Sequence, residues 1–287
     1  MRPIIPLFCL TASLMLAAPA ASALPVPVTP DEGRFLEVTG PLRQSAEMPD
    51  LVARVGQSLI GAPYGEHLLE VEGDGVEPLV TRLDAFDCVT LVETSVAAAR
   101  ALAVKAGQWK GFREELERLR YRDGKRGDYT SRLHYFSEWI ADNERRGLVL
   151  DLTASLGGVP DKRPLRFMTS HREAYKKLRS EKHYRALQAI EADLTKSPRY
   201  VLPVAQVPAV LPLLHSGDIV AIATTIEGLD VVHTGLVLRK PDGAVHLLHA
   251  PVPGSRVQVS EKPLTEYLKA YKVYAGIMVA RPLAPAK

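Results

Sequence analysis

The spacing of apolar residues changes along this chain, and the change limits the folds that it can adopt. Before residue 147 apolar residues recur every three or four positions, which predicts helices over residues 51–60, 88–103, 109–120 and 135–146. From residue 217 the period falls to two, which predicts strands over residues 218–223, 231–238, 244–250, 257–259 and 273–279. Helices followed by antiparallel strands are typical of an α+β fold.

The segment between these two halves combines a short strand with a polar helix. Residues 148–153 have the composition of a strand, and residues of about 170–194 that of a helix rich in lysine and arginine. Acidic residues are interspersed with the basic ones, which favours a solvated face over a site for an anionic polymer. The formal net charge of +3 is also too small to indicate a nucleic-acid partner.

The first residues have the pattern of a secretory signal. Residues 1–23 contain a basic start, an apolar run and small residues at their end, which predicts a cleaved signal peptide and a periplasmic or secreted protein. The run is too short to span a membrane, and no comparable run follows it. We expect an extended lead-in over residues 24–44 and one domain over residues 45–287, with a helical insertion at about 106–147. The sequence does not indicate the oligomeric state.

Cys88 is the only cysteine that the predicted mature chain keeps, because Cys9, the other of the 2, leaves with the signal. A free cysteine is most often a small buried hydrophobe. An exported protein, however, meets an oxidising environment in which an unpaired thiol is a liability, so a retained thiol indicates chemical use. Asp87 can cap the helix that begins at Cys88, and the N-terminus of a helix favours a thiolate over a thiol.

A cysteine nucleophile needs a base, and two of the 8 histidines are suitably placed. His233 and His249 lie on the two arms of a predicted hairpin around the turn at residues 240–243, so the register decides whether they are neighbours. His233 would be the base and His249 the residue that orients it. Each could instead be a hydrogen-bonded histidine of the sheet. A zinc site with Cys88 lacks any close-spaced ligand pair, so we expect no metal and no cofactor.

Several short segments resemble those of a known enzyme family. In order and spacing, four of them resemble the NlpC-type cell-wall cysteine peptidases, which are papain-like: residues 61–64 (GAPY), 86–93 (FDCVTLVE), 233–237 (HTGLV) and 249–251 (HAP). Within that superfamily, residues 132–140 (RLHYFSEWI) and 228–230 (GLD) resemble the N-acetylmuramoyl-L-alanine amidase-like branch. The resemblance extends from about residue 51 to residue 281.

The resemblance implies a papain-like NlpC-type fold, in which a helix that begins at the nucleophile packs on a C-terminal antiparallel sheet. It implies Cys88 as nucleophile, His233 as base and His249 as the orienting residue. It also implies that five residues contact the substrate: Tyr64, Asp87, Arg132, His134 and Asp230. Asp87 could instead serve only as the cap of the helix.

The function implied is hydrolysis of the amide between N-acetylmuramic acid and L-alanine in peptidoglycan or muropeptide fragments, through a thioester. An endopeptidase of the same superfamily, cutting between γ-D-glutamate and the diamino acid, would use the same three residues. The helical region at residues 109–147 favours the amidase. A catalytically inactive peptidoglycan-binding protein is the alternative from another class, and the intact set of Cys88, His233 and His249 argues against it.

Overall fold

The computed structural model describes residues 29–42, 47–73, 75–104 and 109–286, so the predicted signal peptide lies outside the described residues. These residues form an antiparallel eight-stranded sheet in the order β2-β3-β8-β4-β5-β6-β7, with β1 also paired to β8. Its strands are β1 (Val149–Asp151), β2 (Val159–Pro160), β3 (Tyr200–Pro203), β4 (Ile219–Thr224), β5 (Val231–Arg239), β6 (Val245–His249), β7 (Gln258–Val259) and β8 (Tyr274–Pro282).

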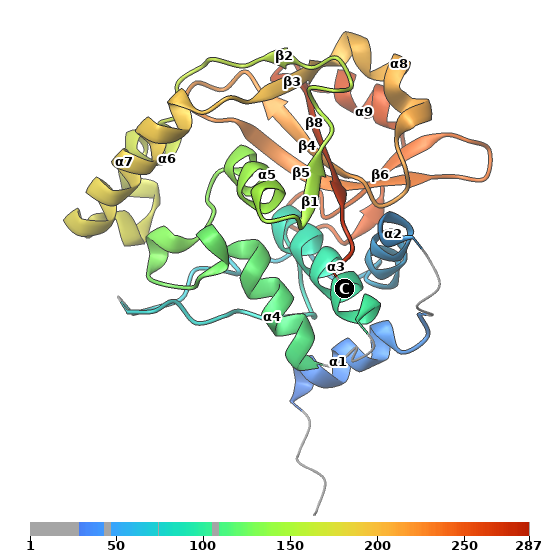
Figure 1. Cartoon of the computed structure of the whole chain (residues 1–287), viewed down its shortest axis with the longest axis horizontal. Coiled ribbons are helices and arrows are strands. Elements are labelled where there is room, and N and C mark those ends of the chain that lie inside the picture. The colour runs from blue at the N-terminus through green and yellow to red at the C-terminus, as the bar shows by residue number, and fades with distance from the viewer. Residues whose placement is uncertain (1–28, 43–46, 74, 105–108, 287) are drawn as a thin grey trace, which may run out of the picture.

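Helices cover both faces of this sheet (Figure 1). One face packs on the helices that precede the sheet in the chain: α1 (Pro30–Thr39), α2 (Met48–Ser58), α3 (Cys88–Ala103), α4 (Trp109–Arg120) and α5 (Phe136–Arg145). The other face packs on two short helices, α8 (Val207–Val210) and α9 (Leu264–Lys269). The α+β architecture predicted from the change in apolar period is therefore confirmed. No helix in the described ranges is long and apolar enough to span a membrane.

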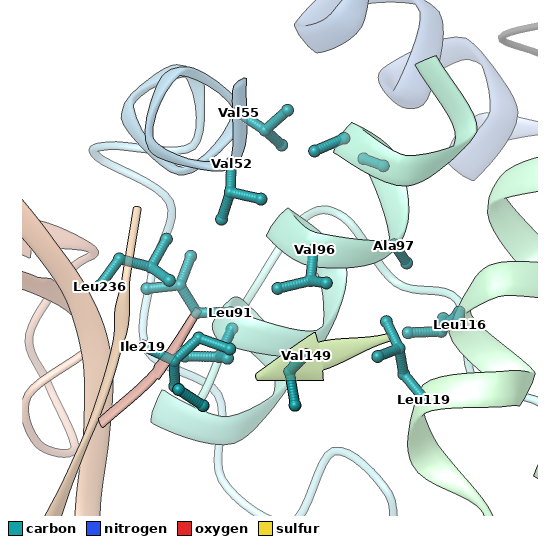
Figure 2. Close-up of a cluster of buried hydrophobic side chains, with 14 of the residues drawn as sticks. Val52, Val55, Leu91, Val96, Ala97, Leu116, Leu119, Val149, Ile219 and Leu236 are labelled. Atoms are coloured by element: carbon teal, nitrogen blue, oxygen red, sulfur yellow. The ribbon is translucent and has the colours of Figure 1, made fainter. Parts of the chain in front are cut away.

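The main core lies between α3 and its neighbours. Figure 2 shows side chains of α2, α3 and α4 meeting residues of the sheet, among them Leu91, Val96 and Leu236. Nearly every residue of α3 is buried, because the helix is enclosed by α2, α4 and the sheet. The residue that begins α3 is therefore held by a rigid element.

Alternation along the strands sorts the sheet residues between its faces. Leu236 of β5 and Leu248 of β6 pack toward α3, whereas Val237 and Leu247 pack toward α9. His249 follows Leu247 by two positions and therefore lies on the α9 face. His233 shares that face with Val237, four positions further along β5.

Two expectations about secondary structure are wrong. Part of the extended lead-in is the helix α1, because Thr29 caps it, Pro30 starts it, and Phe35 packs on Phe112 of α4. The polar helix begins only at Glu181: residues 167–179 form α6 (Phe167–Ser170) and two 3₁₀ turns, and α7 (Glu181–Lys196) follows them. Two short strands, β2 and β3, were not predicted at all.

Candidate active site

Asp87 and Thr90 fix the start of α3. The Asp87 carboxylate accepts hydrogen bonds from the Thr90 backbone N–H at 2.7 Å and from its hydroxyl at 2.8 Å, and the Asp87 N–H donates to the Thr90 hydroxyl at 2.9 Å. This reciprocal capping box makes Cys88 the first residue of the helix. Of the two roles considered for Asp87, the structure shows that of the cap.

The environment of Cys88 keeps its sulfur protonated. Burial raises the pKa of the thiol to about 11, and the nearby carboxylate of Asp87 raises it further. Hydrogen bonds from the N–H and hydroxyl of Thr234 and from the N–H of Cys88 itself oppose this shift without cancelling it. The shift is opposite to the one expected from the helix N-terminus, because burial and the Asp87 charge outweigh the hydrogen bonds to the sulfur.

Thr234 joins the nucleophile helix to the sheet. Its hydroxyl donates a hydrogen bond of 2.9 Å to the backbone oxygen of Cys88. The pairing of β5 with β6 extends from Arg239 opposite Val245 to Leu236 opposite Leu248 and stops before Thr234. The Thr234 N–H can therefore reach the sulfur instead of a β6 carbonyl. Cys88 thus lies where the two strands separate, in contact with Thr234, the residue that follows His233 on β5.

His233 and His249 form a buried pair. Nε2 of His233 and Nδ1 of His249 are 2.8 Å apart, and the two rings are nearly perpendicular. Burial lowers the pKa of His233 to about 3, with a further contribution from His249, and burial lowers the pKa of His249 to about 4. Both imidazoles are therefore neutral at pH 7. Within the described residues, Nδ1 of His233 has no hydrogen-bond partner, so it is the atom available to a thiol proton.

Gly235 allows the close approach that this pair requires. A Cβ at this position would lie 2.8 Å from side-chain atoms of Leu247 and 2.8 Å from the carbonyl oxygen of Leu248. Such contacts would push β6 away from β5. The glycine two positions after His233 therefore helps to set the distance between the imidazoles.

The segment that carries Tyr64 lies beside the loop before Cys88. Tyr64 donates its N–H to Ser255 at 2.9 Å and pairs as an isolated bridge with Phe86. Burial raises the pKa of the Tyr64 phenol to about 12, and the charge of Cys88 contributes to the rise. The structure thus brings Tyr64 within electrostatic range of the sulfur, and its phenol stays protonated.

Arg132 and His134 bind groups of the protein. The Arg132 guanidinium is buried and paired with Glu77 at 2.7 Å, which holds the segment before Cys88 against the helical region. The His134 Nε2 is 2.8 Å from the backbone oxygen of Tyr129. Burial lowers the pKa of His134 to about 3, so its ring is neutral. We assign both residues to the fold rather than to substrate.

Asp230 is buried at the start of α5. Its carboxylate accepts hydrogen bonds of 2.7 Å from the N–H groups of Ser137 and Val231. It therefore satisfies backbone donors of the first turn of α5 and ties that helix to β5. We assign it, too, to the fold.

Tyrosines that the sequence analysis did not select complete the surroundings of the histidines. The Tyr267 ring of α9 packs edge to face on His249, with centroids 5.3 Å apart, and its hydroxyl hydrogen-bonds to Tyr274 of β8. The close spacing of Tyr267, Tyr271 and Tyr274 in the sequence, from α9 to the start of β8, is the signal that could have indicated them. These rings and the histidine pair line a cavity of about 580 Å³. In the described part of the chain, no three His, Cys, Asp or Glu side chains are grouped as metal ligands.

Comparisons with known proteins identify the family of the chain. The model of the AmiA-like, N-acetylmuramoyl-L-alanine amidase-like family matches residues 54–277. A crystal structure of an N-acetylmuramoyl-L-alanine amidase from Bacteroides uniformis is 35% identical, has a TM-score of 0.77, and aligns over 82% of this chain and 99% of its own. A structure from Bacteroides fragilis, described as a candidate xylanase, is 37% identical over 80% of this chain and 99% of its own, with a TM-score of 0.74.

A more distant structure has the same fold. Protein LPG0564 from Legionella pneumophila is 20% identical, with a TM-score of 0.65, and aligns over 89% of this chain and 96% of its own. No curated protein sequence matches the chain. Because the family model covers most of the chain, from the helix before Tyr64 to the last strand, the chain belongs to the AmiA-like, N-acetylmuramoyl-L-alanine amidase-like family.

Proposed function

We propose that this protein is an exported hydrolase that cleaves the amide bond between N-acetylmuramic acid and L-alanine in peptidoglycan fragments. Cys88 is the nucleophile, His233 the base and His249 the residue that orients the base. The observation that carries the proposal is the 2.8 Å contact between the two imidazoles, one residue along β5 from the hydrogen bond that holds Cys88. Family membership supports the choice of bond, and the composition of residues 1–23 supports export.

The resting site holds a neutral thiol beside a neutral imidazole, because burial raises the pKa of Cys88 and lowers that of His233. The reaction therefore begins with general-base catalysis: Nδ1 of His233 takes the thiol proton while the sulfur attacks the lactyl carbonyl carbon. For this, the Nε2–H of His233 donates to Nδ1 of His249, which leaves Nδ1 of His233 unprotonated and keeps the ring oriented. The imidazolium then protonates the departing amine of L-alanine, and the C–N bond breaks to leave a thioester.

The second half of the reaction restores the thiol. A water molecule gives a proton to His233 and attacks the thioester carbonyl, the C–S bond breaks, and the proton returns to the sulfur. The muramoyl carboxylic acid is released. In both tetrahedral intermediates the oxyanion lies near the first turn of α3, where the N–H of Cys88 is a donor. The Tyr64 hydroxyl is the second donor that we assign, since a phenol with a pKa of about 12 remains protonated at neutral pH.

Mass spectrometry of defined muropeptides tests the proposal. Wild-type protein should release a peptide that begins with L-alanine and leave free N-acetylmuramic acid on the sugar side. Cys88→Ala should release neither, whereas His171→Gln, which alters an exposed histidine outside the site, should retain full activity. A muramoyl dipeptide as product would identify an endopeptidase instead. If no product depends on Cys88, the protein is not a cysteine hydrolase of these fragments.

A further inference from the structure

The cavity beside the histidine pair lies on the side of the imidazoles, away from the sulfur of Cys88. His233, His249, Tyr267 and Tyr271 are among the residues that line it. The lining includes neither Cys88 nor Tyr64. The space therefore opens on the side of the imidazoles and not above the sulfur.

This space is nevertheless close to the reacting atoms. The loop after His249 contributes Ser255 to the lining, and the backbone oxygen of Ser255 also accepts the Tyr64 N–H at 2.9 Å. One short loop thus separates the cavity from the segment beside the nucleophile. Burial raises the pKa of Tyr274, and the charges that Tyr271 and Cys88 carry when ionised raise it further, so Tyr274 lies near enough to the sulfur for the two groups to interact.

The chemistry of amide cleavage decides which part of a substrate can occupy such a space. The acid that protonates the departing amine must lie within hydrogen-bond distance of that amine. A group that leaves from Cys88 and takes its proton from His233 must therefore lie on the imidazole side. Under the proposed function this group is the stem peptide, which starts with L-alanine and continues with γ-linked D-glutamate, whose α-carboxylate is free.

The lining has a residue suited to that carboxylate. Lys262 is the only lysine or arginine that lines the cavity, and Glu261 is the only carboxylate; both are exposed, and neither forms a salt bridge within the described ranges. Gln258 and Tyr271 are exposed in the same lining and can hydrogen-bond to peptide groups. With about 580 Å³, the cavity lies in the range of volumes typical of small-molecule sites.

We propose that this cavity is the subsite of the leaving stem peptide and that Lys262 binds the α-carboxylate of its D-glutamyl residue. The proposal rests on the proposed function, because it takes the bond to L-alanine as the one that is cleaved. It goes further in stating that the peptide, and not the sugar, is bound on the histidine side, and that its charge determines specificity.

Kinetics with two matched substrates test the role of Lys262. One is N-acetylmuramoyl-L-alanyl-γ-D-glutamyl-diamino acid, and the other carries a carboxamide in place of the glutamyl α-carboxylate. Lys262→Gln should raise KM for the carboxylate about fivefold with little change in kcat, and should narrow the preference for the carboxylate over the carboxamide. Lys269→Gln removes the same charge from α9 outside the cavity and should leave the preference unchanged. An equal effect of Lys262→Gln on both substrates would overturn the assignment.

A binding measurement separates failure of this subsite from failure of the proposed function. Cys88→Ala protein is titrated calorimetrically with the free stem tripeptide, with and without Lys262→Gln. Binding that weakens about fivefold in the Lys262 variant supports the subsite even if no substrate is cleaved. Cleavage that depends on Cys88, together with peptide binding that does not depend on Lys262, would overturn the subsite and leave the amidase proposal intact. Binding of free N-acetylmuramic acid in place of the peptide would also overturn it.

Discussion

The Thr234 hydroxyl donates a 2.9 Å hydrogen bond to the backbone oxygen of Cys88, and so links the helix of the nucleophile to the strand of His233. This hydrogen bond fixes the position of α3 relative to β5, although the two elements lie far apart in the chain. The same residue directs its N–H to the sulfur, because β6 no longer pairs with β5 there. Thr234 is therefore a positioning residue, which acts through Cys88.

Removing the hydroxyl should weaken catalysis more than stability. Thr234→Val keeps the shape of the side chain but leaves the Cys88 carbonyl without this donor, at a cost of about 1 kcal/mol in the free energy of unfolding. We expect kcat to fall about tenfold, since the sulfur is no longer fixed relative to His233. Thr234→Ser keeps a hydroxyl and should restore most of kcat. Full activity of Thr234→Val, or a loss in Thr234→Ser as large as that in Thr234→Val, would show that the hydrogen bond is not what positions the sulfur.

The protonation of Cys88 can be measured through its reaction with iodoacetamide. Only the thiolate reacts, and with a pKa of about 11 the thiolate is a minor species at pH 8. The rate should be slow at neutral pH and rise about tenfold per pH unit up to about pH 10. Asp87→Asn keeps an oxygen that can cap α3 but removes the charge, so it should speed the reaction. A rate that is already constant above pH 7 would contradict the raised pKa.

Much of the fold could be predicted because its signals are local. The apolar period of α3, the turn at residues 240–243 and the alternation in β5 each depend on neighbouring residues only. The helix α1 was not predicted because the contact that stabilises it is distant in sequence: Phe35 packs on Phe112 only when α4 is folded beside α1. The strand β3 is short and is specified by pairing with β8, which lies far along the chain.

The candidate site also combines features that local sequence predicts with features that depend on tertiary packing. Cys88 and the two histidines could be selected from short segments, since a nucleophile at a helix start and histidines on a hairpin are recognisable locally. The contact between His233 and His249 depends on register and on the close approach at Gly235, which no local pattern specifies. The direction of the Cys88 pKa depends on burial, and the partners of Arg132 and Asp230 depend on tertiary packing.

The neutral histidine pair predicts an unusual pH dependence of activity. The reaction needs an unprotonated His233, and burial lowers the pKa values of His233 and His249 to about 3 and about 4. Activity present at neutral pH should therefore persist as the pH falls and decline only near pH 4, well below the ordinary imidazole value of 6.5. The measurement is kcat/KM from pH 3.5 to 8. A decline centred near pH 6.5 would mean that the pair is solvated in the working enzyme.

The same burial predicts loss of stability in acid. A histidine whose pKa is lowered on folding binds more protons when unfolded, so the free energy of unfolding falls as the pH drops from about 6.5 toward the folded pKa. His134, His233 and His249 all have lowered pKa values, of about 3, about 3 and about 4. Each should contribute a slope of about 1 kcal/mol per pH unit in this window. Urea unfolding at pH 7 and pH 5 measures the slope, and His134→Gln should reduce it by the share of one histidine.

Asp230 provides a test that separates a role in the fold from a role in substrate binding. The buried Asp230 carboxylate accepts hydrogen bonds from the N–H groups of Ser137 and Val231, so Asp230→Ala leaves two backbone donors, one of them buried, without partners. Each such donor costs about 1 kcal/mol or more, which predicts a fall in Tm of roughly 4–8 °C for a domain of this size. Asp230→Asn keeps an acceptor oxygen and should lose less. If the carboxylate instead contacted substrate, its loss would raise KM in both variants with little change in Tm. Thermal unfolding and KM, measured on the same samples, therefore decide between the two roles.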